Sequence, residues 1–213
     1  MGCDIHLHVE EYYDNSWHLV SNNKAPISYY WEEGDKEDTY HNKHDWDPGR
    51  NYLLFNILAG VRSYDDSTSI MKEPVGLPED CSKELMDEYR GWGGDAHTPS
   101  FFTLEELLSF QDLTFPKTMI VDMKGFMEYK KGSVPGNWRY YDFYFSEKLI
   151  SHKEMEERLN LINFADDKEY YTKINISYPY KEVSKHFWNS IIPEMQKLQD
   201  NPKNVRIVFW FDN

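Results

Sequence analysis

The stretch Cys3-Asp4-Ile5-His6-Leu7-His8-Val9-Glu10 decides the fold that we expect for this chain. Apolar and polar residues alternate along it, and a period of two is typical of a half-buried β-strand. Its aliphatic side chains would face the core, and its acidic and histidine side chains would share the other face. Turn-forming residues at 13–16 and a short run at 17–20 then predict a returning strand, so we expect a hairpin here.

The rest of the chain supplies helices and a last strand. The largely apolar stretch Val205–Phe211 predicts a strand that is a candidate partner for the first one. Residues 123–131 are a further helix candidate, and 138–145 and 173–177 are strand candidates. Helices are predicted at about 47–60, 79–89, 103–110, 151–161 and 180–198.

Capping residues place the ends of two of these helices. Asp47 is the expected N-cap of the first helix, and Gly60 suits its C-terminal end. Thr103 and Glu106 have the spacing of a capping box. Residues 91–100 predict a polar turn, whereas the pattern at 112–150 favours no single structure throughout.

This order of elements predicts one α+β domain over residues 1–213. We expect a small mixed or antiparallel sheet that contains the N- and C-terminal strands, is covered by helices and is joined by long polar loops. The longest such loop is expected at 31–47, where acidic side chains accompany His41 and His44.

Composition narrows the class of protein. The chain has 23 basic and 37 acidic residues, for a net charge of −14, and such a surface disfavours a nucleic-acid polymer as partner. No run approaches the roughly 20 apolar residues of a membrane-spanning helix, and no secretory signal is visible. Two cysteines form no disulfide framework. We therefore expect a cytoplasmic protein without a membrane partner.

The histidine strand is the first candidate site. His6 and His8 lie about 7 Å apart on one strand face, so both could bind a divalent metal ion, with Asp4 as a further ligand. Asp4 and Glu10 would be about 20 Å apart by the same rise, so they cannot both bind one ion. Alternatively, the histidines are acid–base catalysts that a carboxylate such as Glu10 orients, or the strand simply has a polar face.

A second candidate is the turn that carries Asp95, His97 and Ser100. Its carboxylate, imidazole and hydroxyl could respectively orient, accept a proton and donate to a phosphate oxygen. Trp92 in the same segment could stack on a base. The alternative is that these side chains only cap their own loop. If the turn meets the histidine strand, three imidazoles would share one site.

Basic and aromatic residues around the first helix form a third candidate. Arg50 and Arg62 flank it and could hold a phosphate, with Asn51 and Tyr52 as further ligand contacts. The alternative for each arginine is a structural ion pair with one of the abundant acids.

Five motifs are familiar as a set. They are Met1-Gly2-Cys3-Asp4-Ile5-His6 with Glu10, Arg50-Asn51-Tyr52 through Val61-Arg62, Leu77-Pro78-Glu79-Asp80, His97-x-x-Ser100 through Leu107, and Val205 through Asn213. Together they resemble a group of small proteins encoded by bacteriophages and prophages. The resemblance spans the chain and is weakest over 112–170. It implies a setting in which phage proteins cleave or capture nucleotide signals of bacterial immunity, in the cytoplasm of an infected bacterium.

Three functions follow as hypotheses. The first is a phosphodiesterase-type hydrolase of a small nucleotide, cyclic or linear, with or without a divalent metal ion. In it His6, His8 and His97 do the chemistry, and the two arginines hold phosphate. The second is a sponge that sequesters the nucleotide without chemistry. The third is an acidic inhibitor that binds a protein. The sequence leaves the ligand and any homo-oligomer open.

Overall fold

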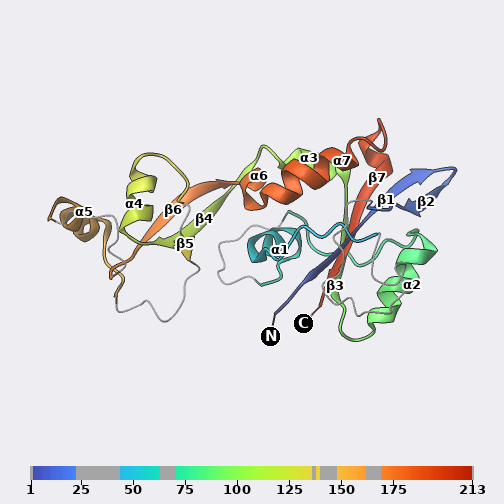
Figure 1. Ribbon diagram of the computed structural model, residues 1–213, viewed down its shortest axis with the longest axis horizontal. Helices are drawn as coiled ribbons and strands as arrows, with labels where there is room; N and C mark the ends of the chain where they lie inside the picture. Colours follow the sequence, from blue (N-terminus) through green and yellow to red (C-terminus); the bar gives the residue numbers. More distant parts are fainter. Residues whose placement is uncertain are drawn as a thin grey trace, which may run out of the picture. The chain divides into compact units, whose positions relative to one another are not determined.

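The computed structural model describes residues 2–22, 44–62, 71–135, 138–139, 148–161 and 169–212. The chain divides into two compact units (Figure 1). The first unit consists of residues 1–62, 70–113 and 180–213, and the second of residues 63–69 and 114–179. Each unit has its own β-sheet.

The sheet of the first unit has four antiparallel strands in the order β2-β1-β7-β3 (Figure 1). The inner strand β7 has all seven of its residues buried, and six of the seven are apolar, the exception being Arg206. The bounds are β1 Ile5–Tyr13, β2 Ser16–Leu19, β3 His97–Thr103 and β7 Val205–Phe211.

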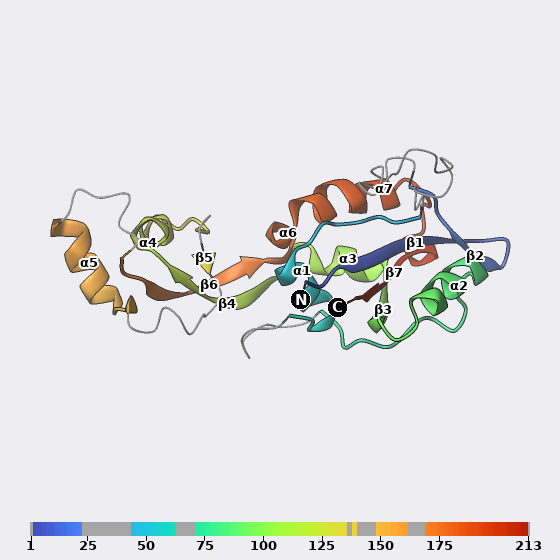
Figure 2. The ribbon, with the colours of Figure 1, turned by 60° about the horizontal axis from the view of Figure 1, so that its bottom comes forward.

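Helices cover both faces of this sheet (Figure 2). On one face Tyr89 of α2 (Lys83–Trp92) packs edge-on against Trp210, with ring centroids 5.3 Å apart. On the other face Phe55 of α1 (Tyr52–Ala59) packs against Phe211, at 5.2 Å. The polar side chains of β1 therefore lie under α2, and its aliphatic side chains lie in the core beside α1.

The helix α1 begins later than predicted. Its N-cap is Asn51, whose Oδ1 accepts hydrogen bonds from the backbone N–H groups of Leu53 and Leu54, so the prediction of Asp47 is wrong. Asp47 Oδ1 instead accepts from Gly49 N–H, because Gly49 adopts a positive φ of 79° and turns the chain before the helix. Gly60 ends the helix in the left-handed conformation, as expected.

Of two further predicted helices, one begins where expected and the other begins later. The capping box of Thr103 and Glu106 is confirmed at the start of α3 (Leu104–Phe110). The α2 helix is shifted by a few residues from its prediction, because Ser82 is its N-cap.

The helix predicted at 180–198 is divided into three pieces. They are α6 Tyr180–Val183, a π-helical turn at Phe187–Ile191 and α7 Ile192–Met195. Pro193 has no N–H to donate to the carbonyl four residues earlier, and the wider turn makes room for its ring. A short 3₁₀ turn at Pro202–Asn204 then leads into β7.

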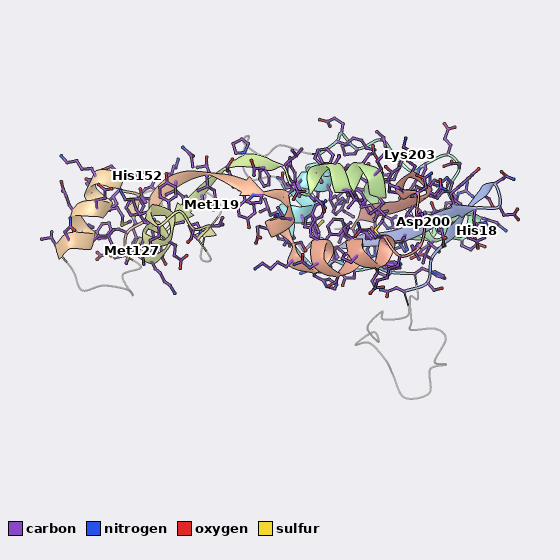
Figure 3. The ribbon with its side chains drawn as sticks, turned by 90° about the horizontal axis from the view of Figure 1, so that it is seen from above. His18, Met119, Met127, His152, Asp200 and Lys203 are labelled. Carbon is purple, nitrogen blue, oxygen red and sulfur yellow. The ribbon has the colours of Figure 1, made fainter. Side chains whose placement is uncertain are left out.

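The second unit has a three-stranded antiparallel sheet in the order β5-β4-β6. In Figure 3 the labelled Met119, Met127 and His152 belong to this unit. They lie on β4, α4 and α5, respectively. The bounds are β4 Thr114–Val121, α4 Met123–Lys130, β5 Trp138–Arg139, α5 His152–Leu161 and β6 Thr172–Pro179.

The α+β class and the pairing of the first and last strands are confirmed. The turn predicted over 91–100 is wrong from His97 onward, because β3 begins there and pairs with β7. The single domain over 1–213 stays a prediction, since division into units does not test independent folding. The predicted strand at 138–145 and the loop at 31–47 fall largely outside the described residues, His41 included.

Across the described ranges, no helix is long and apolar enough to span a bilayer. A cytoplasmic location stays a prediction.

Candidate functional site

Asp212 joins several polar groups at one end of the four-stranded sheet. The register pairs Ile5 with Phe211, so the residues next to them, Asp4 and Asp212, lie side by side. Asp4 N–H donates to Asp212 Oδ1 at 2.8 Å, and Asp212 N–H donates to the Asp4 carbonyl at 3.2 Å. The second carboxylate oxygen lies 3.3 Å from His6 Nε2. We call Asp4, His6, Arg50, Trp92 and Asp212 the Asp212 cluster.

His6 has the surroundings of an acid–base group. Its side chain is 15% exposed, and its ring lies against Trp92 with centroids 4.0 Å apart. A neutral ring that donates from Nε2 to Asp212 carries its lone pair on Nδ1. The carboxylate would also stabilise the imidazolium that forms when Nδ1 takes a proton.

Arg50 is bound to this cluster through Asp4. Its Nε donates to Asp4 Oδ1 at 2.6 Å, and its Nη2 donates to the other oxygen. This guanidinium lowers the pKa of the Asp4 carboxyl. About half of the Arg50 side chain is exposed, so a ligand can reach its outer edge. The prediction of a structural ion pair is confirmed here, and it does not remove Arg50 from solvent.

Arg62 contacts the chain segment that precedes β1. Its Nη2 donates to the Gly2 carbonyl at 3.2 Å, and its guanidinium lies 5.8 Å from the centre of the Tyr52 ring. Tyr52 also packs against Phe55 at 5.7 Å. Asn51 does not face a ligand, because its oxygen caps α1 and its Nδ2 donates to the Val183 carbonyl at 2.7 Å.

His8 differs from His6 because it is fully buried. Its ring stacks on Trp210 at 4.8 Å, and Nδ1 lies 3.1 Å from the His44 carbonyl. Its Nε2 is 3.5 Å from Glu88 Oε1. Burial lowers the pKa of His8 to about 3, so the ring is neutral near pH 7. A proton acceptor with that pKa is a poor general base. His8 instead has a structural role, since its ring packs against Trp210.

Asp45 follows His44, whose carbonyl contacts this buried histidine. Burial, with the nearby charges of Asp47 and Glu88, raises the pKa of Asp45 to about 7. A carboxyl with such a pKa changes its charge in the physiological range.

Glu10 has a structural role instead of the predicted catalytic one. It is fully buried, and its carboxylate accepts from Arg206 Nε at 2.8 Å and from Ser82 N–H at 2.7 Å. Arg206 in turn donates to Asp80 at 2.8 Å. Glu10 therefore pairs with a strand neighbour and does not orient a histidine.

The second candidate site is not brought to the histidine strand. His97 pairs with Phe211 in the register and stacks on its ring at 5.9 Å, which places it on the opposite sheet face from His6. Ser100 is buried on that same face, where its Oγ accepts from Val75 N–H at 3.4 Å. Asp95 is exposed in the turn after α2. The expectation that three imidazoles meet at one site is wrong.

The predicted metal ligands also diverge. Asp4 is hydrogen-bonded to Arg50, and His8, two residues after His6 on β1, is fully buried. Among the residues that the structure describes, no group of three or more His, Cys, Asp or Glu side chains is arranged to hold a metal ion. The metal site at Asp4, His6 and His8 therefore has no support from this part of the chain.

Comparison with known proteins adds no further constraint. No protein-family model, curated protein or solved structure matches this chain.

Proposed function

We propose that the protein is a hydrolase of a small nucleotide, cyclic or linear, and that the Asp212 cluster is its active site. The observation that carries this proposal is the pairing of the partly exposed His6 with Asp212 at 3.3 Å. An imidazole that a carboxylate orients is a common general base for water or for a ribose hydroxyl.

The remaining groups of the cluster suit a nucleotide. Trp92 offers an aromatic face beside His6, on which a base can stack. The outer edge of Arg50 would donate to a phosphate oxygen, with Arg62 as a second donor. The resemblance to phage-encoded proteins favours a nucleotide signal of bacterial immunity as the substrate.

One observation favours the alternative, a sponge that binds the same ligand without cleaving it. Acid–base hydrolysis without a metal ion usually needs a second titrating group to protonate the leaving oxygen. His8 is buried and neutral near pH 7, and His97 is on the other face of the sheet. A sponge needs only the aromatic face and the arginines.

The deciding experiment incubates the protein with cyclic mono-, di- and trinucleotides and ADP-ribose derivatives, with and without EDTA. The protein is then denatured and the nucleotides are separated by chromatography. New products support the hydrolase, and their loss with EDTA assigns a metal to the reaction. Depletion from solution with intact recovery supports the sponge. If no nucleotide is changed or depleted, both proposals are wrong.

A further inference from the structure

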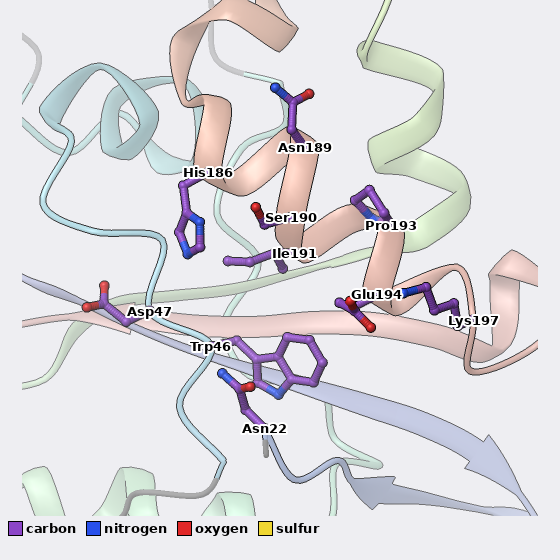
Figure 4. Close-up of a pocket in the computed structure, with 10 residues that line it drawn as sticks. All are labelled: Asn22, Trp46, Asp47, His186, Asn189, Ser190, Ile191, Pro193, Glu194 and Lys197. Carbon is purple, nitrogen blue, oxygen red and sulfur yellow. Dashed lines mark ion pairs between the residues drawn. The ribbon is translucent and has the colours of Figure 1, made fainter. Parts of the chain in front are cut away.

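A cavity of about 480 Å³ lies in the first unit, between the segment that carries Trp46 and the helical stretch from His186 to Lys197 (Figure 4). Its volume is within the range of small-molecule sites. None of its lining residues belongs to the Asp212 cluster. The helical stretch contains the π-helical turn, a distortion that is frequent at functional sites.

The floor of this cavity is a fixed aromatic ring. Trp46 is 7% exposed, its Nε1 donates to the Val20 carbonyl at 3.2 Å, and its backbone N–H donates to the Leu7 carbonyl at 2.8 Å. The indole is therefore held in place before any ligand binds, which avoids an entropic cost of binding. Ile191 lies across the cavity from the indole and gives the site a second apolar wall (Figure 4).

Two carboxylates lie on opposite sides of the indole, Asp47 on one side and Glu194 on the other (Figure 4). Lys197 pairs with Glu194 at 2.9 Å, but the lysine is 67% exposed, and such a pair on a helix surface is weak. The lining thus has two acids and one lysine, together with the imidazole of His186, in a chain with a net charge of −14. This field attracts a cation and repels a phosphate.

Neutral polar side chains also line the cavity. Asn22 is one of them, and its Nδ2 donates to the Asp45 carbonyl at 3.0 Å. Asn189 and Ser190 contribute an amide and a hydroxyl oxygen from the π-helical turn. Ammonium groups need several such oxygens to replace their water.

We propose that this cavity binds an aliphatic diamine. Its methylene chain lies over Trp46, one ammonium group binds Asp47, and the other replaces Lys197 at Glu194. Two separated carboxylates match two cationic ends, and the aromatic floor packs against the methylene chain between them.

Isothermal titration calorimetry with three compounds of similar length tests the proposal on the full chain. The compounds are 1,4-diaminobutane, butylamine and 1,4-butanediol. We expect the diamine to bind most tightly, the monoamine about tenfold more weakly and the diol not measurably. A charge-assisted hydrogen bond contributes about that factor.

Substitutions then locate the binding. Asp47→Asn and Glu194→Gln should each weaken diamine binding about tenfold, because each removes one charged acceptor. The matched control is Glu105→Gln, which removes an equal charge from a surface pair with Lys203 at 3.7 Å. It should leave the affinity unchanged.

A gain of affinity provides the sharpest check. Lys197→Ala removes the competing cation from Glu194 and should tighten diamine binding several-fold, whereas Lys203→Ala should not. Circular dichroism verifies that each variant is folded. The proposal is overturned if the diamine binds no better than butylamine, or if Glu105→Gln weakens binding as much as Glu194→Gln.

Discussion

His6 and His8 lie on the same face of β1, but burial gives their imidazoles different chemistry. His6 keeps contact with solvent and pairs with Asp212, whereas His8 is sealed under α2 against Trp210. The alternation of the sequence predicted the shared face and could not predict the difference, because it depends on which helix covers the strand.

The first prediction concerns turnover at the Asp212 cluster. His6→Asn and Asp212→Asn should each lower the rate of nucleotide cleavage at least about 100-fold, because one removes the base and the other its orienting carboxylate. Nucleotide binding by His6→Asn should change little. The control is His18→Asn on β2, a histidine that contacts Ser16 and Tyr13. Equal activity of His6→Asn and wild type would remove His6 from the mechanism.

The second prediction concerns the buried pair of Glu10 and Arg206. Glu10→Gln leaves the guanidinium buried with one fewer charge opposite it, so the free energy of unfolding should fall by about 3 kcal/mol. Glu105→Gln breaks an exposed pair and should cost under about 1 kcal/mol. Urea denaturation measures both. Similar losses for the two variants would show that burial of the ion pair has no special weight.

The third prediction concerns Asp45 and pH. The pKa of this carboxyl is raised from its usual 3.8 to about 7 in the folded protein, so the folded state binds the proton more tightly. Its stabilising contribution is present below about pH 4 and is lost as the pH rises through about 7. Asp45→Asn should therefore become progressively more stable than wild type over that range.

Urea denaturation at several pH values measures this difference, with the exposed Asp200→Asn as control. His8 acts in the opposite sense, because its lowered pKa makes its contribution disappear as the pH falls from about 6.5 toward 3. The comparison between Asp45→Asn and wild type cancels the effect of His8. A stability difference that does not vary with pH would contradict the assignment.

At the scale of elements, the sequence predicted the structure correctly where the stabilising hydrogen bonds join residues that are close in sequence. The capping box at Thr103 and the hairpin at 13–16 are examples, since their hydrogen bonds join neighbours in sequence. The strand β3 had no such signal. Its residues include Pro99 and polar side chains, and they form a strand because β7 needs a partner on that edge.

The site was predicted only in part for a related reason. His6, Arg50 and Trp92 were found as residue types with suitable chemistry, but their partner Asp212 was not. It follows the last apolar strand, and the pairing of that strand with β1 places it beside Asp4. Pairing the two strands antiparallel, with their alternation aligned, could have predicted this contact.

The fourth prediction belongs to α1 and its cap. Asn51→Ala removes the oxygen that accepts from Leu53 and Leu54, so the free energy of unfolding should fall by about 1 kcal/mol or more. Asp47→Ala should cost less, since Asp47 lies before the helix. Asn51→Asp keeps the capping oxygen and loses only the bond to Val183. If Asp47→Ala is the more damaging change, the cap is assigned wrongly.

At the scale of the whole molecule, the larger part of the second unit, residues 114–179, is an insertion in the first. The chain leaves the first unit after Leu113 and returns at Tyr180, and Tyr180 N–H donates to the Leu113 carbonyl at 3.1 Å. The two ends of the insertion are thus already in hydrogen-bond contact, a distance that a tight turn can span.

The fifth prediction follows from that contact. Replacing residues 114–179 by a short Gly-Asn-Gly turn should leave the first unit folded, with a cooperative urea transition. The diamine affinity of the Trp46 cavity, if the full chain has one, should be retained, because all its lining residues are in the first unit. A shortened chain without a cooperative transition would show that the first unit needs the insertion to fold.

The position of β7 has a consequence for synthesis on the ribosome. This strand lies between β1 and β3, yet it follows every other described strand in chain order. During translation β1 and β3 emerge long before β7, the strand that lies between them. Until β7 is made, the edges of β1 and β3 that pair with it have no hydrogen-bond partner strand. The insertion, by contrast, has all its described strands on consecutive stretches of chain, so none of its pairings depends on a strand at the end of the chain. A nascent chain that stalls before residue 205 would expose the apolar faces of the first unit to chaperones.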